Sequence, residues 1–407
     1  MDTSFFVRQV IEDPFDPDIR LVFADYLEEH EDARSELIRI QAERAAVDIY
    51  DPRRLELVAR EQEVLKRAGY SFFGQLPDGV PPLCSEGGFY SGVSLSVTAF
   101  LKHKSKLFKS APITTLRLDG RTGKLQRLAD SKELKQIENL TFAVNAGPEQ
   151  LSLFFSSPNL IRLKTLKLEI TRLTPDIMST ILQSAFAANL RSIEFSNTYG
   201  TGDWVLETIA GTPLPKLTSL ALGDSRVSEA GIALLADAEA FENLESLQFA
   251  GAFSSTAFAR LQDLGVCQNL VRLSAQQPSL TSTAFDLRSP LPHLRWLRAG
   301  SALTSADLKR IIRHYPELEI LELPGNSIDD TGVTVLLESG IYSRLRRLDF
   351  SGNQITLEGA EDLAFEHNGI TEVLLDQNAL NQADIKSIRN RFGTRFGRFT
   401  IRRTRGT

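Results

Sequence analysis

The stretch LEILELPGNSIDDTGVTVLL, residues Leu318–Leu337, sets leucines at a stepped spacing and then places an asparagine after a Pro-Gly pair. Successive side chains of a strand face opposite ways, so Leu321 and Leu323 are expected to point into a core while Glu322 points outward. The amide of Asn326 can donate to and accept from the backbone where the chain turns out of the strand. The stretch therefore predicts a strand, a turn and then a helix.

The same apolar-x-x-apolar-x-apolar pattern recurs along the chain at intervals of 23 to 27 residues. Thirteen copies begin at Tyr90, Ile113, Ile137, Leu163, Leu190, Leu217, Leu244, Leu270, Leu294, Leu318, Leu345, Ile370 and Phe396. One copy means little because amphipathic helices produce it by chance, but thirteen in near-register form a strong signal. The interval falls within the roughly 20–29 residues of leucine-rich repeats. No repeat can bury its apolar face alone, so we expect the repeats to stack into a parallel sheet covered by helices on one side.

The repeats resemble the longer leucine-rich repeats of the ribonuclease-inhibitor type. The likeness is carried by apolar-x-x-x-Gly steps after the turn, at Val227 to Gly231, Ile328 to Gly332 and Ile355 to Gly359. The resemblance implies an α/β solenoid shaped as a horseshoe, with the sheet on its concave face and helices on its convex face.

Asparagine occupies the predicted turn position in four repeats, at Asn145, Asn326, Asn353 and Asn378. Other repeats place Thr171, Thr198 or Ser225 there, and these side chains offer fewer hydrogen bonds. After the turn, polar residues precede segments with helical spacing, and Ser228, Asp330 and Thr356 are the predicted N-caps. We expect these four asparagines to act as structural residues of the turns.

Residues 1–80 show a different pattern and predict a small helical module, followed by a repeat domain of about thirteen repeats over 81–407. Asp16 and Pro17 are expected to begin a helix. Its apolar stripe is Ile19, Val22, Phe23, Tyr26 and Leu27. Asp32 is expected to cap the next helix, and Asp51 with Pro52 to begin a third.

The stretch DPDIRLVFADYLEEHEDARSELIRIQ, residues 16–41, resembles the repeat-companion domain that precedes leucine-rich repeats in planctomycete bacterial proteins. Residues 88–118 resemble the junction seen in that family. This chain has Tyr26 where the family more often has Trp, and His30-Glu31 where a turn containing Gly is usual. The resemblance implies an architecture, and it implies no established biochemical activity.

Composition and motifs argue against an enzyme. The five histidines are scattered, Cys84 and Cys267 are far apart, and no metal, nucleophile-elbow or phosphate-loop motif occurs. Cys267 and His293 precede the strands of adjacent repeats, and the simplest interpretation is a core thiol and a loop imidazole. We expect no catalytic residue, no cofactor and no metal site. The sequence has no secretory signal and no membrane-spanning run, so a cytoplasmic protein without membrane contact is predicted.

The strand positions that face outward are the predicted binding surface for another protein. They include Ile320 of the opening stretch, and Trp296 beside arginines has the composition of an interface hot spot. The candidate partner-binding residues are Arg272, Trp296, Arg298, Glu322, Arg347, Asp349 and Glu372. This face offers no deep apolar pocket, so a small-molecule substrate is not expected.

Two further functions follow from the charge distribution. The C-terminal segment carries the basic residues Arg389, Arg391, Arg395, Arg398, Arg402, Arg403 and Arg405. With Phe392, Phe396 and Phe399 between them they are compatible with nucleic-acid binding, but Phe396, Phe399 and Ile401 fit the inward positions of a capping strand, so nucleic-acid binding is the less favoured alternative. Residues 1–80 carry 18 acidic and 10 basic side chains, a net charge of −8, so salt-dependent head-to-tail self-assembly is the other alternative.

Overall fold

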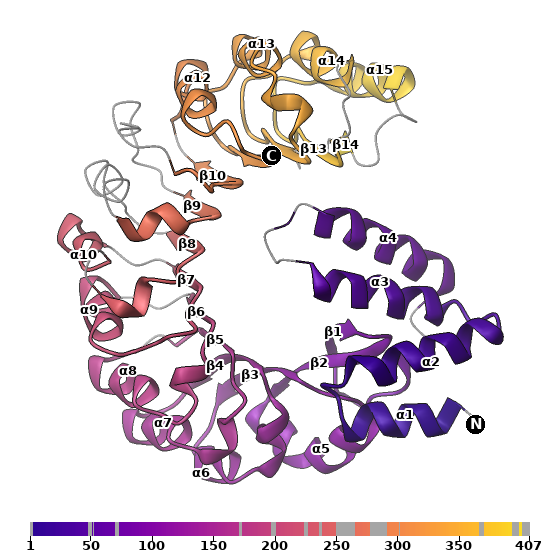
Figure 1. The fold of residues 1–407 in the computed structure, drawn as a ribbon, viewed down its shortest axis with the longest axis vertical. Helices are drawn as coiled ribbons and strands as arrows, with labels where there is room; N and C mark the ends of the chain where they lie inside the picture. The colour runs from indigo at the N-terminus through magenta and orange to yellow at the C-terminus, as the bar shows by residue number, and fades with distance from the viewer. Residues whose placement is uncertain are drawn as a thin grey trace. The chain divides into compact units, whose positions relative to one another are not determined.

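The computed structural model describes residues 3–47, 51, 53–69, 73–170, 173–196, 201–223, 227–235, 238–249, 265–276, 291–300, 302–365, 370–392 and 399–400 (Figure 1). The chain divides into two compact bodies. The N-terminal body contains Met1–Tyr199 and Thr212–Leu217, and the C-terminal body contains Gly200–Gly211 and Thr218–Thr407.

The N-terminal body begins with four helices and continues with strands that alternate with helices. The four helices are α1 (Thr3–Glu12), α2 (Pro17–Glu29), α3 (Arg34–Ala46) and α4 (Arg53–Ala68). The strands are β1 (Pro82–Glu86), β2 (Phe89–Ser96), β3 (Thr115–Arg121), β4 (Asn139–Asn145), β5 (Thr165–Leu168) and β6 (Ser192–Phe195). The helices between them are α5 (Val97–Ser110), α6 (Leu125–Ala129), α7 (Pro148–Phe155) and α8 (Pro175–Leu182).

The C-terminal body repeats the strand and helix alternation. Its strands are β7 (Ser219–Leu222), β8 (Ser246–Phe249), β9 (Arg272–Gln276), β10 (Trp296–Gly300), β11 (Ile320–Glu322), β12 (Arg347–Asp349), β13 (Glu372–Leu374) and β14 (Phe399–Thr400). Its helices are α9 (Asp203–Ala210), α10 (Glu229–Ala233), α12 (Ser305–His314), α13 (Asp330–Glu338), α14 (Leu357–Phe365) and α15 (Gln382–Phe392). In each body the helices between strands lie along one side of the sheet (Figure 1).

In both bodies the strands follow one another in chain order, and the pairs from β2 to β6 and from β7 to β14 are parallel. Equivalent leucines stand side by side, as Leu297, Leu321 and Leu348 do on β10, β11 and β12. All three are fully buried. The predicted α/β leucine-rich-repeat solenoid is thereby confirmed, because strand, turn and helix recur and each repeat packs on the next.

Strand β1 was not predicted from the sequence. It pairs with β2 in an antiparallel hairpin, in contrast to the parallel pairs that follow. The turn contains Gly87 and Gly88, whose φ values of 57° and 75° suit a two-residue hairpin turn that glycine adopts readily. The Gly-Gly pair at the start of GGFY is the sequence signal for this turn.

The N-terminal module contains four helices where three were expected, because Thr3–Glu12 also forms a helix. Phe6 and Val10 of α1 pack with Phe23 of α2 and Phe89 of β2 in one buried cluster. The predicted stripe of α2 is wrong at Val22, which is 54% exposed. Asp16 does cap α2, where it accepts hydrogen bonds from the backbone of the first turn.

Arg34 joins the module to the first strands. Its guanidinium lies 5.0 Å from the Phe23 ring centroid and 4.2 Å from that of Phe89. Its Nε donates to the carbonyl oxygen of Gly88 at 2.8 Å, and burial lowers the pKa of Arg34 to about 10. The module therefore packs on the β1–β2 hairpin through a buried cation between two aromatic rings.

The turn between α2 and α3 keeps the backbone form of a glycine turn without glycine. Glu31 has a φ of 56°, in the left-handed region that glycine favours. The N-cap of α3 is Ala33 and not the predicted Asp32, although the Asp32 carboxylate accepts a hydrogen bond from the backbone nitrogen of Arg34 at 2.8 Å.

Three of the four turn asparagines hydrogen-bond to backbone groups of neighbouring repeats. Asn353 donates to the carbonyl oxygens of Leu323 at 2.8 Å and Phe350 at 2.9 Å, and accepts from the nitrogen of Ile328 at 3.0 Å. Asn326 and Asn378 each make equivalent hydrogen bonds to backbone groups of the repeat that precedes their own. Asn145 is different, because it lies at the exposed end of β4.

The predicted caps of the repeat helices are correct at two positions and wrong at one. Ser228 caps α10, and Thr356 accepts from the nitrogen of Glu358 at the start of α14. The cap of α13 is Asp329 and not Asp330. Asp330 instead binds across to the next repeat, where it accepts hydrogen bonds from the backbone nitrogen and hydroxyl of Thr356 at 2.9 and 2.5 Å.

Replacing Asn353 with alanine should lower the free energy of unfolding by about 2–4 kcal/mol, because it leaves a buried carbonyl and a buried N–H without partners. Asn145→Ala is the matched control and should change this free energy by less than about 0.5 kcal/mol. Urea unfolding followed by far-ultraviolet circular dichroism measures both. Equal effects of the two substitutions would contradict the role given to Asn353.

Candidate functional site on the open strand face

The side of each sheet opposite the buried leucines is called here the open strand face. In the C-terminal body its centre is the carboxylate of Glu322 on β11. Trp296 donates its indole N–H to Glu322 Oε2 at 3.1 Å, and Arg298 Nη1 lies 3.4 Å from the same oxygen. Arg347 Nε lies 2.9 Å from Oε1. One carboxylate thus joins side chains from β10 and β12.

The cluster extends by one strand on each side. The Arg272 guanidinium on β9 lies over the Trp296 ring at 4.0 Å from its centroid. Arg347 Nη1 forms an ion pair with Glu372 Oε2 on β13 at 2.9 Å. The parallel register explains this order, because Arg272, Trp296, Arg347 and Glu372 occupy one row across the strands. Cross-strand neighbours in such a row lie within side-chain reach.

Two of the predicted binding residues are less accessible than expected. Glu322 is only 2% exposed, and Asp349 is also buried, with its carboxylate accepting from the backbone nitrogen of Ser351 at 2.9 Å. Ile320, predicted to point outward, is buried between its row neighbours Trp296 and Arg347. The alternation of the strand is correct, but the longer side chains of β10 and β12 cover the middle of the face.

The open strand face of the N-terminal body carries a second ion network, which the sequence analysis missed. Arg117 on β3 forms an ion pair with Glu169, which follows β5, at 2.7 Å, reaching past β4. Lys167 on β5 pairs with Glu194 on β6. The signal in the sequence is the charged residues at outward positions of β3, β5 and β6.

The pair of Arg117 and Glu169 shifts both ionisation equilibria. The hydrogen bond from Arg117 lowers the pKa of Glu169 below its ordinary value of 4.5, and the same bond raises the pKa of Arg117. The ion pair is therefore retained at neutral pH, where both groups are charged.

The basic C-terminal patch falls mostly outside the part of the chain that the structure describes. Arg389 and Arg391 lie within α15. Arg395, Arg398, Arg402, Arg403 and Arg405 lie outside the described residues. The nucleic-acid hypothesis that depended on this patch stays a prediction.

Cys267 and His293, the pair considered in the sequence analysis, differ in exposure. Cys267 is buried, and burial raises the pKa of its thiol to about 12, while His293 is exposed. Within the described ranges, no group of three or more His, Cys, Asp or Glu side chains is arranged to hold a metal ion. The helices of those ranges are all too short or too polar to span a membrane.

Comparison with known proteins yields one family match and several structural likenesses. A family profile described as Leucine Rich repeat matches residues 344–364, within the repeat that contains β12 and α14. No curated protein matches the chain. The chain thus contains leucine-rich repeats, an assignment that depends on this match and on the recurring strand, turn and helix.

Two solved structures illustrate the similarity. An internalin (inlF) from Listeria monocytogenes is 15% identical, with a TM-score of 0.39, over 71% of this chain and 79% of that one. The Rad7 and Elc1 complex of yeast contains a chain that is 13% identical, with a TM-score of 0.48, over 69% of this chain and 74% of that one.

Glu322→Ala should reduce the free energy of unfolding by about 3–5 kcal/mol, because it leaves the partly buried charges of Arg298 and Arg347 without their shared partner. Glu372→Ala, in the neighbouring row and at a more accessible position, should cost about 1 kcal/mol or less. Urea unfolding followed by tryptophan fluorescence measures both, since Trp204 and Trp296 belong to the C-terminal body. A loss at Glu322 no larger than that at Glu372 would count against the central role of this carboxylate.

Arg117→Met should remove about 0.5–1 kcal/mol of stability at neutral pH. Because the folded pKa of Glu169 lies below its ordinary value of 4.5, the pair stabilises fully above that pH and loses its effect as the pH falls through the folded value. The difference between wild type and variant should therefore shrink in acid. Urea midpoints measured across acidic pH test this, with the exposed Arg121→Met on the same strand as control. A difference independent of pH would show that packing, and not charge, carries the effect.

Proposed function

We propose that this chain is a non-enzymatic scaffold that binds another protein on the open strand face of its C-terminal body. The observation that carries the proposal is the cluster around Glu322, in which Trp296, Arg298 and Arg347 are held by one buried carboxylate. Hot spots of protein interfaces are enriched in Trp and Arg. Side chains already fixed in place lose little conformational entropy on binding, so the cluster is suited to anchor a partner.

Fewer residues of this proposed surface are accessible than the sequence analysis predicts. Arg298, Arg347 and Glu372 retain 30%, 24% and 19% side-chain exposure, so they can contact a partner directly. Trp296 and Arg272 are half-buried, whereas Glu322 and Asp349 support the others from below. We propose that the partner presents both acidic and basic groups, since the accessible side chains carry both signs.

The domain assignment, the location and the lack of a cofactor predicted from the sequence are also part of the proposal. We propose that residues 1–80 form a repeat-companion module of the planctomycete type, that 81–407 form the repeat domain, and that the protein acts in the cytoplasm without cofactor. Nucleic-acid binding and head-to-tail assembly receive no support from a specific contact within the described residues, so neither is advanced as a second function.

The test is capture of binding proteins from the native cell with immobilised wild type and a Trp296→Ala, Arg298→Ala double variant. Loss of the aromatic and guanidinium anchors should reduce the captured partner about tenfold or more. Arg313→Ala on the exposed side of α12 is the matched control and should capture as wild type does. Circular dichroism must show that the double variant is folded. A folded double variant that captures the same proteins in the same amounts would eliminate this surface.

A further inference from the structure

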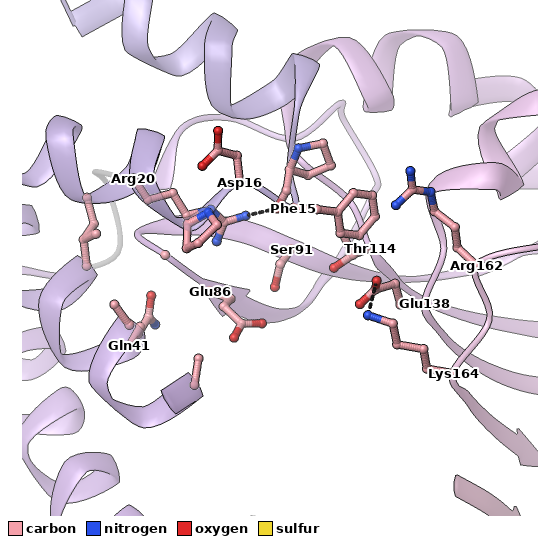
Figure 2. A pocket seen from close by; sticks show the side chains of 16 residues that line it. Phe15, Asp16, Arg20, Gln41, Glu86, Ser91, Thr114, Glu138, Arg162 and Lys164 are labelled. Atoms are coloured by element: carbon pink, nitrogen blue, oxygen red, sulfur yellow. Dashed lines mark hydrogen bonds and ion pairs between the residues drawn. The ribbon is translucent and has the colours of Figure 1, made fainter. Parts of the chain in front are cut away.

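A pocket of about 380 Å³ lies inside the N-terminal body, between the helical module and the first repeats (Figure 2). The helical side consists of the segment Pro14–Pro17, Arg20 of α2 and the face of α3 that carries Ile38, Gln41, Ala42 and Ala45. Its volume is at the lower end of the ~300–1,000 Å³ typical of small-molecule sites. No such pocket was expected from the sequence.

The repeats contribute the other side of the pocket from equivalent positions. Ser91, Thr114, Glu138 and Lys164 line it, and each of the last three donates its backbone N–H to the carbonyl oxygen of the one before. They therefore form one row along the edge of the sheet where the strands begin. The pocket exists only where the helices of the module cover this row.

Arg20 projects into the pocket with most of its donors unused. Its Nη2 donates to the carbonyl oxygen of Pro14 at 2.8 Å, and this is its one hydrogen bond to the residues that the structure describes. Gly87 makes room for it, since a Cβ at that position would lie 2.1 Å from Arg20 Nη1. Burial lowers the pKa of Arg20, and the neighbouring carboxylate of Glu86 partly offsets this effect. A guanidinium has five N–H donors, so several remain for a ligand.

Arg162 supplies a second cation on the opposite side of Phe15. Its guanidinium lies over the Phe15 ring at 4.6 Å from the centroid, and Figure 2 shows the two side chains next to each other. Stacking fixes the plane of the guanidinium and leaves its N–H edges available, the arrangement that suits a carboxylate. Among the described residues, Arg162 has no hydrogen-bond or ion-pair partner.

The other charges of the pocket already have partners. Lys164 and Glu138 form an ion pair at 2.5 Å. Asp16 accepts hydrogen bonds from the backbone nitrogens of Asp18 and Ile19. The lining thus carries three basic and three acidic side chains, and Arg20 and Arg162 are the two cations for which the described residues supply no ion pair.

We propose that this pocket binds a carboxylate attached to a small apolar group, with the carboxylate on the unused donors of Arg20, Arg162 supplying a second positive charge beyond Phe15, and the apolar part against Phe15, Ile38 and Ala42. A single negative charge meets less repulsion from the carboxylates of Asp16 and Glu86 than a doubly charged phosphate would. The same chemistry is present in a free organic acid and in the C-terminal residue of a peptide. This proposal does not depend on the protein-binding surface of the C-terminal body.

Isothermal titration calorimetry of the full chain with four probes tests the proposal. N-acetyl-L-leucine should bind saturably, and N-acetyl-L-leucinamide, which lacks the carboxylate, should bind at least about tenfold more weakly. The peptide acetyl-Ala-Ala-Ala-Leu with a free C-terminus separates the sources. Tighter binding of the peptide assigns the pocket to a chain end, and tighter binding of the free acid assigns it to a small metabolite. Inorganic phosphate should bind more weakly than either.

Variants assign the binding to this pocket. Arg162→Gln changes an exposed residue, so it should fold normally and weaken binding of N-acetyl-L-leucine about tenfold. Gly87→Ala should weaken it as well by displacing Arg20, and Arg8→Gln on the exposed side of α1 is the matched control with unchanged affinity. The proposal is overturned if none of the probes binds, if the amide or phosphate binds as well as the acid, or if folded Arg162→Gln retains wild-type affinity.

Discussion

The structure depends on one constraint, which is that no repeat can satisfy its own backbone or bury its own leucines. Each strand is too short to be stable alone, so Leu297, Leu321 and Leu348 exclude water only because they stand in one column. The turns obey the same constraint. Asn353 takes its carbonyl partners from its own and the preceding repeat and gives its oxygen to Ile328, so the polar groups of one turn are completed by the next.

This repetition converts sequence positions into continuous rows on the molecular surface. The row through Arg272, Trp296, Arg347 and Glu372 becomes the proposed protein-binding surface because its residues are large and charged. The row through Ser91, Thr114, Glu138 and Lys164 becomes one side of a pocket because the helical module covers it. Both surfaces thus derive from the same stacking, and they differ in the side chains present and in what lies above them.

The sequence was sufficient for the repeats because a hydrophobic period repeated thirteen times averages out local ambiguity. It was less informative where a single feature decides the structure. Strand β1 depends on one Gly-Gly turn, α1 on ten residues at the start of the module, and the cap of α13 on a choice between adjacent aspartates. The partners of Glu322 could not be predicted from the sequence. The alternation of a strand predicts which face a side chain lies on, but it does not predict which neighbouring side chains reach it. The pocket was equally hidden, since it joins residues about 150 positions apart.

The interlocking of helix starts has a consequence for how such a chain can change in length. Asp330 at the start of α13 binds Thr356 at the start of the following helix, and Asp203 of α9 binds Ser228 at the start of α10 in the same manner. In these pairs the start of one helix supplies a carboxylate that the start of the next helix binds. Deletion of a segment that runs between corresponding positions of two repeats again places a carboxylate at one helix start beside its hydrogen-bond donors at the next. Deletion of any other length separates these groups. Genetic loss or gain in this region should be tolerated only in whole multiples of the repeat.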